Sequence, residues 1–409
     1  MSVNTNKTLR ACFVYYQTFG QLLYREAMAL QNAGYKVDII CLKSNHTEKT
    51  FRNYNGINIH QIHSRPSAER TVYLYLFRML LFFIKSTMLL SYLSLRKRYS
   101  VIHVTSPPDI AVFTALVPKL MGAQIILDIH DIGPELYMRK LNVKESHFVI
   151  KILKYMERVS ANFSDHVITV THIWRDRLVS RSVPQEKCSV LLNVPDTGLF
   201  KPYPTNRRDN AEGFNLFYHG TLEEHFGVDT LLEAMPLIKS HIDKVQLHIY
   251  GPKRGRLFDK LVSYADNHNL GSFVTFYGAV PFYELPEILV SADIGMVPTK
   301  DSIFSDEAVS MKSFEYIFSG IPIVISKTIG HQYYYDESMV KFFKPCDSAD
   351  LAKAVIELYE NKIERAQQVN NAQRFIDQYR WDIHKNVYLQ IITGNSSPSG
   401  KKKEDGACL

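Results

Sequence analysis

The chain has 409 residues, of which 46% are hydrophobic and 22% charged, and its formal net charge is +7. This length suffices for two domains of ordinary size, and the composition excludes a disordered protein. The small positive excess, with no stretch that interleaves cations with exposed aromatic residues, argues against nucleic acid as a partner and fits an anionic substrate or membrane surface.

The cysteines and the first residues bear on the cellular setting. The five cysteines are scattered and form no C-x-x-C pair, which argues against zinc and redox sites. The polar stretch 1–7 leads into a strand and contains no apolar signal-peptide region. We therefore expect a reduced, cytoplasmic setting.

The first half alternates between strand and helix patterns. We expect a buried strand at residues 9–16, a turn at Gly20, a helix at 22–33 and a strand at 37–42. This order defines a βαβ unit, which requires a parallel sheet with helices packed on it. Further strands are expected at residues 101–104, 124–128 and 166–170.

Residues 72–99 form a long apolar segment that Arg78 and Lys85 interrupt, so it falls short of an unbroken membrane span of roughly 20 residues. The spacing of the two cations places them on one helix face, opposite a wide apolar face, and residues 96–98 add a basic end. Such a helix can lie at the surface of an anionic membrane, which predicts a peripheral protein at the inner face of the cell membrane. The alternative is a core helix of the first domain.

A change of composition at residues 194–213, with three prolines and clustered charges, predicts a linker. Strand patterns then resume at residues 214–218, 245–250, 274–277, 294–297 and 321–325. We expect an α/β protein with two Rossmann-like, doubly wound domains, residues 1–195 and 196–390, and a ligand cleft at the carboxyl ends of both sheets. The last helix is free to pack back on the first domain, and residues 391–409 are expected to be a disordered tail.

Two segments of the first domain are candidate site segments. Gly20 follows the first strand, where a glycine brings backbone N–H groups and a helix N-terminus close to an anion, although an ordinary tight turn is the alternative. His130 and Asp131 follow the strand at 124–128, so they should emerge at the carboxyl edge of the sheet. No G-x-G-x-x-G pattern is present, which argues against a dehydrogenase.

The second domain contributes two glycine turns. Gly220, Thr221 and His225 follow its first strand, in a turn that suits phosphate binding by backbone amides. Lys253 and Arg254 lie in a loop after the next strand, where they would neutralise a diphosphate or be ordinary solvated charges.

The most specific pattern contains Glu307 and Glu315, separated by seven residues, with Lys312 between them. If Glu307 lies in a loop and Glu315 in the following helix, both carboxylates can face one ligand and accept hydrogen bonds from sugar hydroxyls. The amides of residues 308–311, at the start of that helix, would favour a phosphate.

Together these segments resemble a large family of retaining glycosyltransferases, family four, which has the GT-B fold. The stretch Glu307-x7-Glu315, followed by Gly320 and Pro322, is similar to the family's E-x7-E signature, and His130-Asp131 resembles its first-domain histidine motif. The resemblance covers roughly residues 9–390. It implies two Rossmann-like domains that face each other across a cleft, a nucleotide-sugar donor and no metal; no D-x-D metal motif appears in a suitable loop.

The resemblance also implies roles for individual residues. Glu315 would hold the ribose of the nucleotide, and Glu307 the hydroxyls of the donor sugar. His130 would contact the transferred sugar and steady the transition state, and Gly20 would lie near the diphosphate and the acceptor. Charge and positioning would then stabilise an oxocarbenium-like state and the leaving diphosphate.

The chain departs from the family pattern in the glycine turn of the second domain. Family members carry Arg and Lys where this chain has Thr221 and Phe226, so His225, Lys253 and Arg254, with help from Lys312, are expected to hold the diphosphate. The predicted function is sugar transfer to a lipid-linked or glycan acceptor in cell-surface polysaccharide assembly. The alternatives are a nucleotide-sugar epimerase of the same fold and an inactive relative that binds a partner protein.

Overall fold

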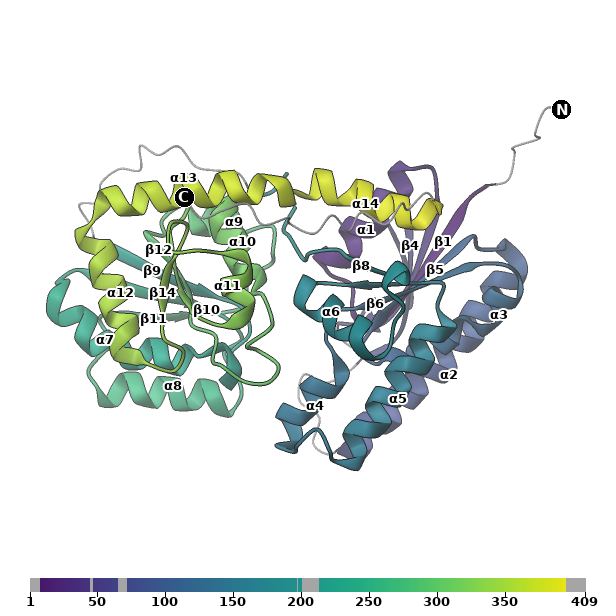
Figure 1. Cartoon of the computed structure of the whole chain (residues 1–409), viewed down its shortest axis with the longest axis horizontal. Coiled ribbons are helices and arrows are strands. Elements are labelled where there is room, and N and C mark those ends of the chain that lie inside the picture. The colour runs from purple at the N-terminus through teal and green to yellow at the C-terminus, as the bar shows by residue number, and fades with distance from the viewer. Residues whose placement is uncertain (1–7, 45–46, 65–71, 197, 201–212, 395–409) are drawn as a thin grey trace. The chain divides into compact units, whose positions relative to one another are not determined.

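The computed structural model describes residues 8–44, 47–64, 72–196, 198–200 and 213–394, which form two compact units (Figure 1). The first unit extends to Leu192 and includes the described residues from His384 onward, and the second comprises Asn193–Ile383. The first boundary thus lies three residues before the expected one at 195, and the chain returns to the first unit at His384, within the last described helix, rather than at residue 390. Most of the expected linker (201–212) and of the expected tail (395–409) lies outside the described residues.

The first unit contains an eight-stranded sheet in the order β3-β4-β2-β1-β5-β6-β7-β8. Its strands are β1 (Arg10–Thr18), β2 (Lys36–Lys43), β3 (Phe51–Tyr54), β4 (Ile57–Ser64), β5 (Val101–Ser106), β6 (Gln124–Ile129), β7 (His166–Thr169) and β8 (Cys188–Val190). All neighbouring strands are parallel except β3 and β4. The strand order reverses beside β1, and the carboxyl edge at such a point is where doubly wound folds bind ligands.

Helices connect these strands. They are α1 (Gln21–Asn32), α2 (Val72–Lys97), α3 (Leu116–Leu120), α4 (Gly133–Leu141), α5 (Phe148–Phe163), α6 (His172–Arg181) and α14 (Trp381–Thr393). Strand β5 is buried at every position, as a central parallel strand covered on both faces must be. Helix α14 joins this core through Tyr388, Ile391 and Ile392, all of which are buried.

The second unit contains a six-stranded parallel sheet in the order β11-β10-β9-β12-β13-β14. Its strands are β9 (Phe214–His219), β10 (Val245–Tyr250), β11 (Val274–Tyr277), β12 (Ile294–Val297), β13 (Ile323–Ser326) and β14 (Lys341–Phe343). Its helices are α7 (Val228–His241), α8 (Arg256–Asn267), α9 (Leu285–Leu289), α10 (Met311–Phe318), α11 (Ile329–Tyr334), α12 (Ser348–Glu360) and α13 (Lys362–Ile376). The order reverses between β9 and β12, so each unit is doubly wound, as predicted.

Helix α2 turns a mixed stripe inward, in which Phe82, Leu90 and Leu93 are buried beside two serines, and an apolar stripe outward. Ser86 and Ser94 are buried, and their hydroxyls donate to the carbonyls of Phe82 and Leu90, one turn earlier. The outward stripe consists of the exposed side chains of Tyr73, Phe77, Leu80, Ile84, Met88, Tyr92 and Leu95. By length and composition alone α2 is also apolar enough to cross a membrane, and only 17% of its most apolar window is buried. Helix α2 therefore contributes one face to the interior of the first unit and leaves an apolar face exposed, so it is not purely a core helix.

Candidate functional site

The site in the second unit is centred on the turn after β9. Gly220 has φ +119°, and a Cβ there would lie 2.7 Å from Cε of Lys312. A Cβ on Gly251, which follows β10, would lie 2.6 Å from the carbonyl oxygen of Gly220. The two glycines therefore bring the turns after β9 and β10 into contact and leave room for the Lys312 side chain beside them.

Lys312 and Glu315 lie one turn apart on α10 and share a largely buried environment. The Lys312 ammonium is 4.1 Å from the centre of the Phe226 ring and 5.3 Å from that of Tyr218. A carboxylate oxygen of Glu315 is 3.5 Å from Nε2 of His219. Phe226 is the position where the resemblance leads us to expect a cation, and the structure places the ammonium of Lys312 over its ring.

Burial shifts the pKa values of Glu315, Lys312 and His219. It raises the pKa of Glu315 to about 8, an effect that Lys312 partly offsets. It also lowers the pKa of Lys312 to about 8, which Glu315 partly offsets. Burial and the charge of Lys312 lower the pKa of His219 to about 3, so His219 is neutral at physiological pH. An anionic ligand beside Lys312 would stabilise its ammonium form.

Packing fixes α10 at this edge of the sheet. The Tyr316 ring covers Gly295 of β12 so closely that a Cβ on Gly295 would lie 2.4 Å from it. The Tyr316 hydroxyl donates to the carbonyl of Phe217 in β9, at 2.8 Å. These contacts hold α10 against the middle of the sheet and thereby position Glu315.

Glu307 lies in the loop before α10, half-buried, whereas Glu315 lies within the helix. The neighbouring Asp306 accepts hydrogen bonds from the amides of Ile329 and Gly330, through its carboxylate and its carbonyl respectively. A Cβ on Gly330 would lie 2.8 Å from the carbonyl oxygen of Glu307, so the loop backbone rests directly on the start of α11. The loop that carries Glu307 is therefore fixed by its backbone.

The remaining predicted residues of this unit lie around the same turns. Thr221 is exposed next to Gly220, and Lys253 and Arg254 are exposed in the loop that Gly251 opens. The His225 ring lies 4.0 Å from the Phe226 ring, the same ring that Lys312 covers. The structure thus brings Gly220, His225, Lys312 and Glu315 into one connected set.

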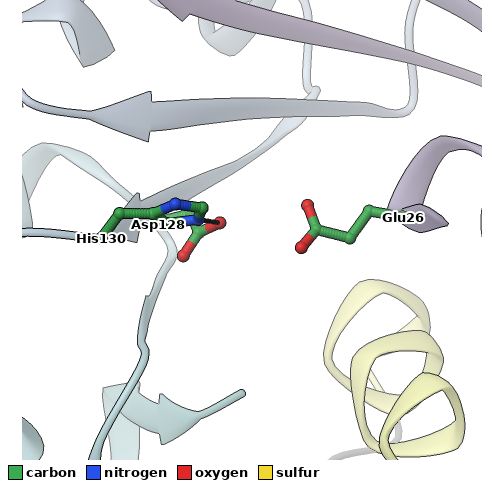
Figure 2. A group of neighbouring side chains, drawn as sticks. All are labelled: Glu26, Asp128 and His130. Carbon is green, nitrogen blue, oxygen red and sulfur yellow. Dashed lines mark hydrogen bonds and ion pairs between the residues drawn. The ribbon is translucent and has the colours of Figure 1, made fainter. Parts of the chain in front are cut away.

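In the first unit, His130 is anchored by Asp128 at the end of β6. Its Nε2 lies 2.8 Å from Oδ2 of Asp128, and its side chain is 16% exposed, so it retains access to solvent. Nε2 of the fully buried His103, in β5, lies 3.1 Å from the same oxygen. Glu26 of α1 faces Asp128 and His130 from the opposite side (Figure 2).

This cluster has strongly shifted proton affinities. Burial alone would raise the pKa of Asp128, but the two imidazoles outweigh it and hold that pKa well below its usual range. Burial opposes the charge of His130, yet Asp128 and Glu26 raise the pKa of His130 to about 9. Burial and the charge of Asp128 raise the pKa of Glu26. His130 is therefore an imidazolium at neutral pH, paired with a buried carboxylate.

Single ligand atoms of Glu26, Asp128 and His130 lie within 4.8 Å of one another, which is a spacing that a cation could bridge. The Asp128 oxygen already accepts from both imidazoles, so the cluster is internally neutralised. Its chemistry fits a held imidazolium better than an open metal site.

Gly20 precedes α1, the helix that carries Glu26. Its backbone is extended, with φ −142°, and a Cβ there would meet only the carbonyl oxygen of Thr18, at 3.9 Å. The fold therefore has no steric need for glycine at this position, and the role of Gly20 in ligand binding stays a prediction.

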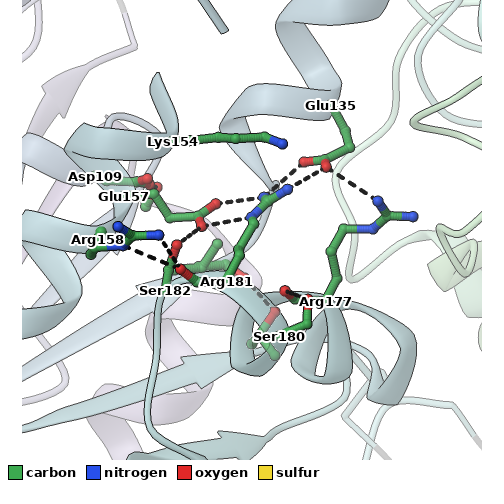
Figure 3. A network of polar contacts seen from close by, with 12 residues as sticks. Asp109, Glu135, Lys154, Glu157, Arg158, Arg177, Ser180, Arg181 and Ser182 are labelled. Carbon is green, nitrogen blue, oxygen red and sulfur yellow. Dashed lines mark hydrogen bonds and ion pairs between the residues drawn. The ribbon is translucent and has the colours of Figure 1, made fainter. Parts of the chain in front are cut away.

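An ion network supports the segment that follows His130 (Figure 3). Arg181, at the end of α6, donates to Glu135 of α4 at 2.5 and 3.0 Å and to Glu157 of α5 at 2.7 and 2.8 Å. Both carboxylates are almost fully buried. Because Glu135 lies in the first turn of α4, Arg181 ties the end of the His130 loop to two other helices.

Sequence reasoning did not assign roles to Asp128, His103, His219 or Tyr388. Asp128 and His219 stand next to predicted site residues, so their positions at strand ends were a usable signal. His103 is an isolated polar residue in a buried strand. Tyr388 is 285 residues from its partner His103, and no local pattern links them.

Comparisons with known proteins agree with this architecture. Residues 20–199 match the family described as Glycosyltransferase Family 4, and residues 205–375 match Glycosyl transferases group 1. The two Rossmann-like units have the fold of GT-B glycosyltransferases. More particularly, the first unit is similar to family-4 glycosyltransferase domains and the second to group-1 glycosyltransferase domains.

Two curated relatives are mannosyltransferases. One, from Mycobacterium tuberculosis, is a GDP-mannose-dependent alpha-(1-6)-phosphatidylinositol monomannoside mannosyltransferase, 27% identical over 57% of this chain and 63% of its own length. The other, from Candida glabrata, is a chitobiosyldiphosphodolichol beta-mannosyltransferase, 22% identical over 62% of this chain and 61% of its own. The matches thus span less than two thirds of these relatives.

Solved structures share the fold at low sequence identity. Sucrose-phosphate synthase from Thermosynechococcus elongatus has a TM-score of 0.76 at 17% identity, covering 94% of this chain and 100% of its own. HepE from Anabaena, in complex with UDP-glucose, has a TM-score of 0.69 at 14% identity, with the same coverage.

Proposed function

We propose that the chain transfers a sugar, with retention of anomeric configuration and without a metal, from a nucleotide-sugar donor to a lipid-linked or glycan acceptor in cell-surface polysaccharide assembly. One observation carries this proposal: the ammonium of Lys312 and the carboxylate of Glu315 lie together beside the turn at Gly220. A cation next to a glycine turn suits a diphosphate, and a carboxylate suits the hydroxyl pair of a ribose.

The division of roles follows from this placement. Lys312, the turn at Gly220 and the exposed cations Lys253 and Arg254 bind the diphosphate, while Glu315 binds the ribose. Glu307, on its fixed loop, binds hydroxyls of the donor sugar. The solved relative with UDP-glucose and the GDP-mannose-dependent relative support a nucleotide-sugar donor in this class.

His130 supplies charge in the first unit. Its imidazolium, paired with Asp128, offers a fixed N–H donor to the sugar and its leaving group, and stabilisation of developing charge is a large part of catalysis in such transfers. Gly20 leaves space near the same edge of the sheet for the diphosphate and the acceptor.

A donor screen tests the proposal. Thermal stability is measured with UDP-, GDP- and ADP-sugars, and a donor at a hundred times its Kd should add about 2.7 kcal/mol of stability. Glu315→Gln should abolish the shift, while Glu360→Gln, at an exposed position on α12, should retain it. If no nucleotide sugar stabilises the wild-type chain, the proposed donor class is wrong.

Product analysis tests the reaction. Proton NMR of the transferred sugar should show the anomeric configuration of the donor, and activity should persist in EDTA. Inversion would refute the retaining mechanism, and loss of activity in EDTA would refute metal independence. A donor that isomerises without any acceptor would identify an epimerase instead.

We further propose that α2 docks on the inner face of an anionic membrane. Its exposed apolar stripe is flanked by Lys85 and Arg96, both exposed, which is the arrangement of a helix lying in a lipid interface. Leu120 of α3, which packs against α2, extends the apolar surface with 80% of its area exposed.

Vesicle sedimentation tests this docking. The chain should bind vesicles that contain phosphatidylserine and bind less in high salt. Phe77→Ser/Leu80→Ser should lose binding, whereas Ile363→Ser, which removes an equally exposed apolar residue of α13, should retain it. Equal binding by all variants would overturn the assignment of α2.

A further inference from the structure

The histidine cluster of the first unit continues inward through a chain of buried hydrogen bonds. Nδ1 of His103 lies 3.0 Å from the hydroxyl of Tyr388, on α14. Nε2 of His103 meets Oδ2 of Asp128, which also binds His130. The chain therefore runs from Tyr388 through His103 and Asp128 to His130, and only His130 is partly exposed.

We propose that Tyr388 and His103 are positioning residues that act through Asp128 to orient His130 and to keep the positive charge of the relay on it. The effect of Tyr388 and His103 on sugar transfer rests on the proposed function. The hydrogen-bonded chain from Tyr388 to His130, here called the relay, is a property of the folded first unit and does not depend on that function.

The direction of each hydrogen bond follows from donor chemistry. Asp128 is a carboxylate and accepts, so both Nε2 atoms must donate to it. The tautomer of His103 that donates from Nε2 accepts at Nδ1, and the Tyr388 hydroxyl is the donor that satisfies this nitrogen. Asp128 thus fixes the tautomer of His103, and Tyr388 supports that tautomer from the other side of the ring.

Removing the Tyr388 hydroxyl takes away this support. Nδ1 of His103 then becomes a buried acceptor without its partner, and the His103 ring loses the contact that holds it against Asp128. Asp128 is then oriented less well toward His130, so the pKa of His130 should fall.

Other charged groups also face this site, from several elements. They are Glu26 and Arg25 of α1, Asp128 of β6, His103 of β5, and Asp131 in the loop of His130. Substitution at Tyr388 changes none of these groups, so a shift in the pKa of His130 in Tyr388→Phe reports on the loss of the hydroxyl.

The test measures His130 directly. Histidine side chains are labelled with nitrogen-15 in the full chain, His130 is assigned by its loss in His130→Gln, and its tautomer and pKa are followed by NMR. Tyr388→Phe should lower the pKa of His130 by about one unit, and Asp128→Asn should lower it to about 6.5 or below. Tyr99→Phe is the matched control, since that buried hydroxyl donates to another buried carboxylate, Asp38, at 3.0 Å.

Transfer kinetics give the second measurement. The alkaline limb of the kcat profile should move to lower pH in Tyr388→Phe by the same amount as the His130 titration, with little change in the KM for the donor. A His130 titration within about 0.3 unit of wild type in Tyr388→Phe would overturn the proposal. If the chain transfers no sugar at all, the proposed function fails while the NMR result still decides the relay.

Discussion

Replacing Arg181 by methionine should destabilise the first unit more than almost any other single change. The substitution keeps side-chain volume but strands Glu135 and Glu157, which are 3% and 1% exposed and receive four hydrogen bonds from this one guanidinium. Removing one partner of a buried ion pair costs about 3–5 kcal/mol. Because Arg177 also approaches Glu135, at 3.4 Å, we expect about 4 kcal/mol in total rather than twice that.

The two tryptophans of the chain make this measurable. Trp174 is buried on α6, the helix that ends at Arg181, while Trp381 begins α14. In a Trp381→Phe background, Trp174 fluorescence follows unfolding near the network. For a unit of this size, a loss of about 4 kcal/mol lowers Tm by roughly 10 °C.

A compensating variant separates charge from packing. Glu135→Gln/Glu157→Gln/Arg181→Met replaces both carboxylates with neutral amides of the same shape, so it should regain most of the lost stability. If Arg181→Met alone unfolds within about 1 kcal/mol of the parent, or if the triple variant is no better than the single one, the network does not stabilise the unit through its charges.

Three further predictions concern individual positions in the two units. Burial gives Lys312 a pKa of about 8, and a diphosphate binds its ammonium form, so the contribution of Lys312 to donor affinity should weaken about tenfold between pH 7 and 9. Glu315 also has a pKa of about 8, so this contribution is measured as the difference in donor affinity between the wild-type chain and Lys312→Ala at each pH. Gly227→Ala should destabilise the second unit by more than about 3 kcal/mol in chemical denaturation, because φ is +68° and the new Cβ would lie 1.8 Å from the carbonyl oxygen of Pro298. The control Gly271→Ala adds a Cβ in open space and should be nearly neutral in the same experiment. Gly20→Ala should leave Tm nearly unchanged but raise the KM for donor or acceptor; an unaltered KM would show that no ligand uses this space.

The sequence predicted the layout of the fold because buried parallel strands are short apolar runs, and each run expected here corresponds to an observed strand. It missed the hairpin of β3 and β4, because burial in β4 alternates only over its first six positions and the residue types follow this alternation only at Ile57 and Ile59, while the buried position 61 is a glutamine. Strands β8 and β14 have three residues each and are too short to show any period.

The sequence could predict only those parts of the site that lie in local motifs. His130 follows the end of a strand, Glu307 lies in the loop before a helix and Glu315 lies within that helix, and the sequence marks all three positions clearly. The contact of Lys312 with Phe226 depends on how two loops and a helix meet, and it explains how this chain keeps a cation where the family pattern seemed lost. The His103–Tyr388 bond depends on α14 belonging to the first unit, which no local pattern specifies.

The place of α14 has a consequence for biosynthesis. Tyr388, Ile391 and Ile392 complete the interior of a unit whose other residues leave the ribosome some two hundred codons earlier. Until α14 is translated, the first unit lacks these three buried side chains, while most of the second unit has already been made. Truncations that stop before residue 388 should therefore damage the half of the protein that was made first.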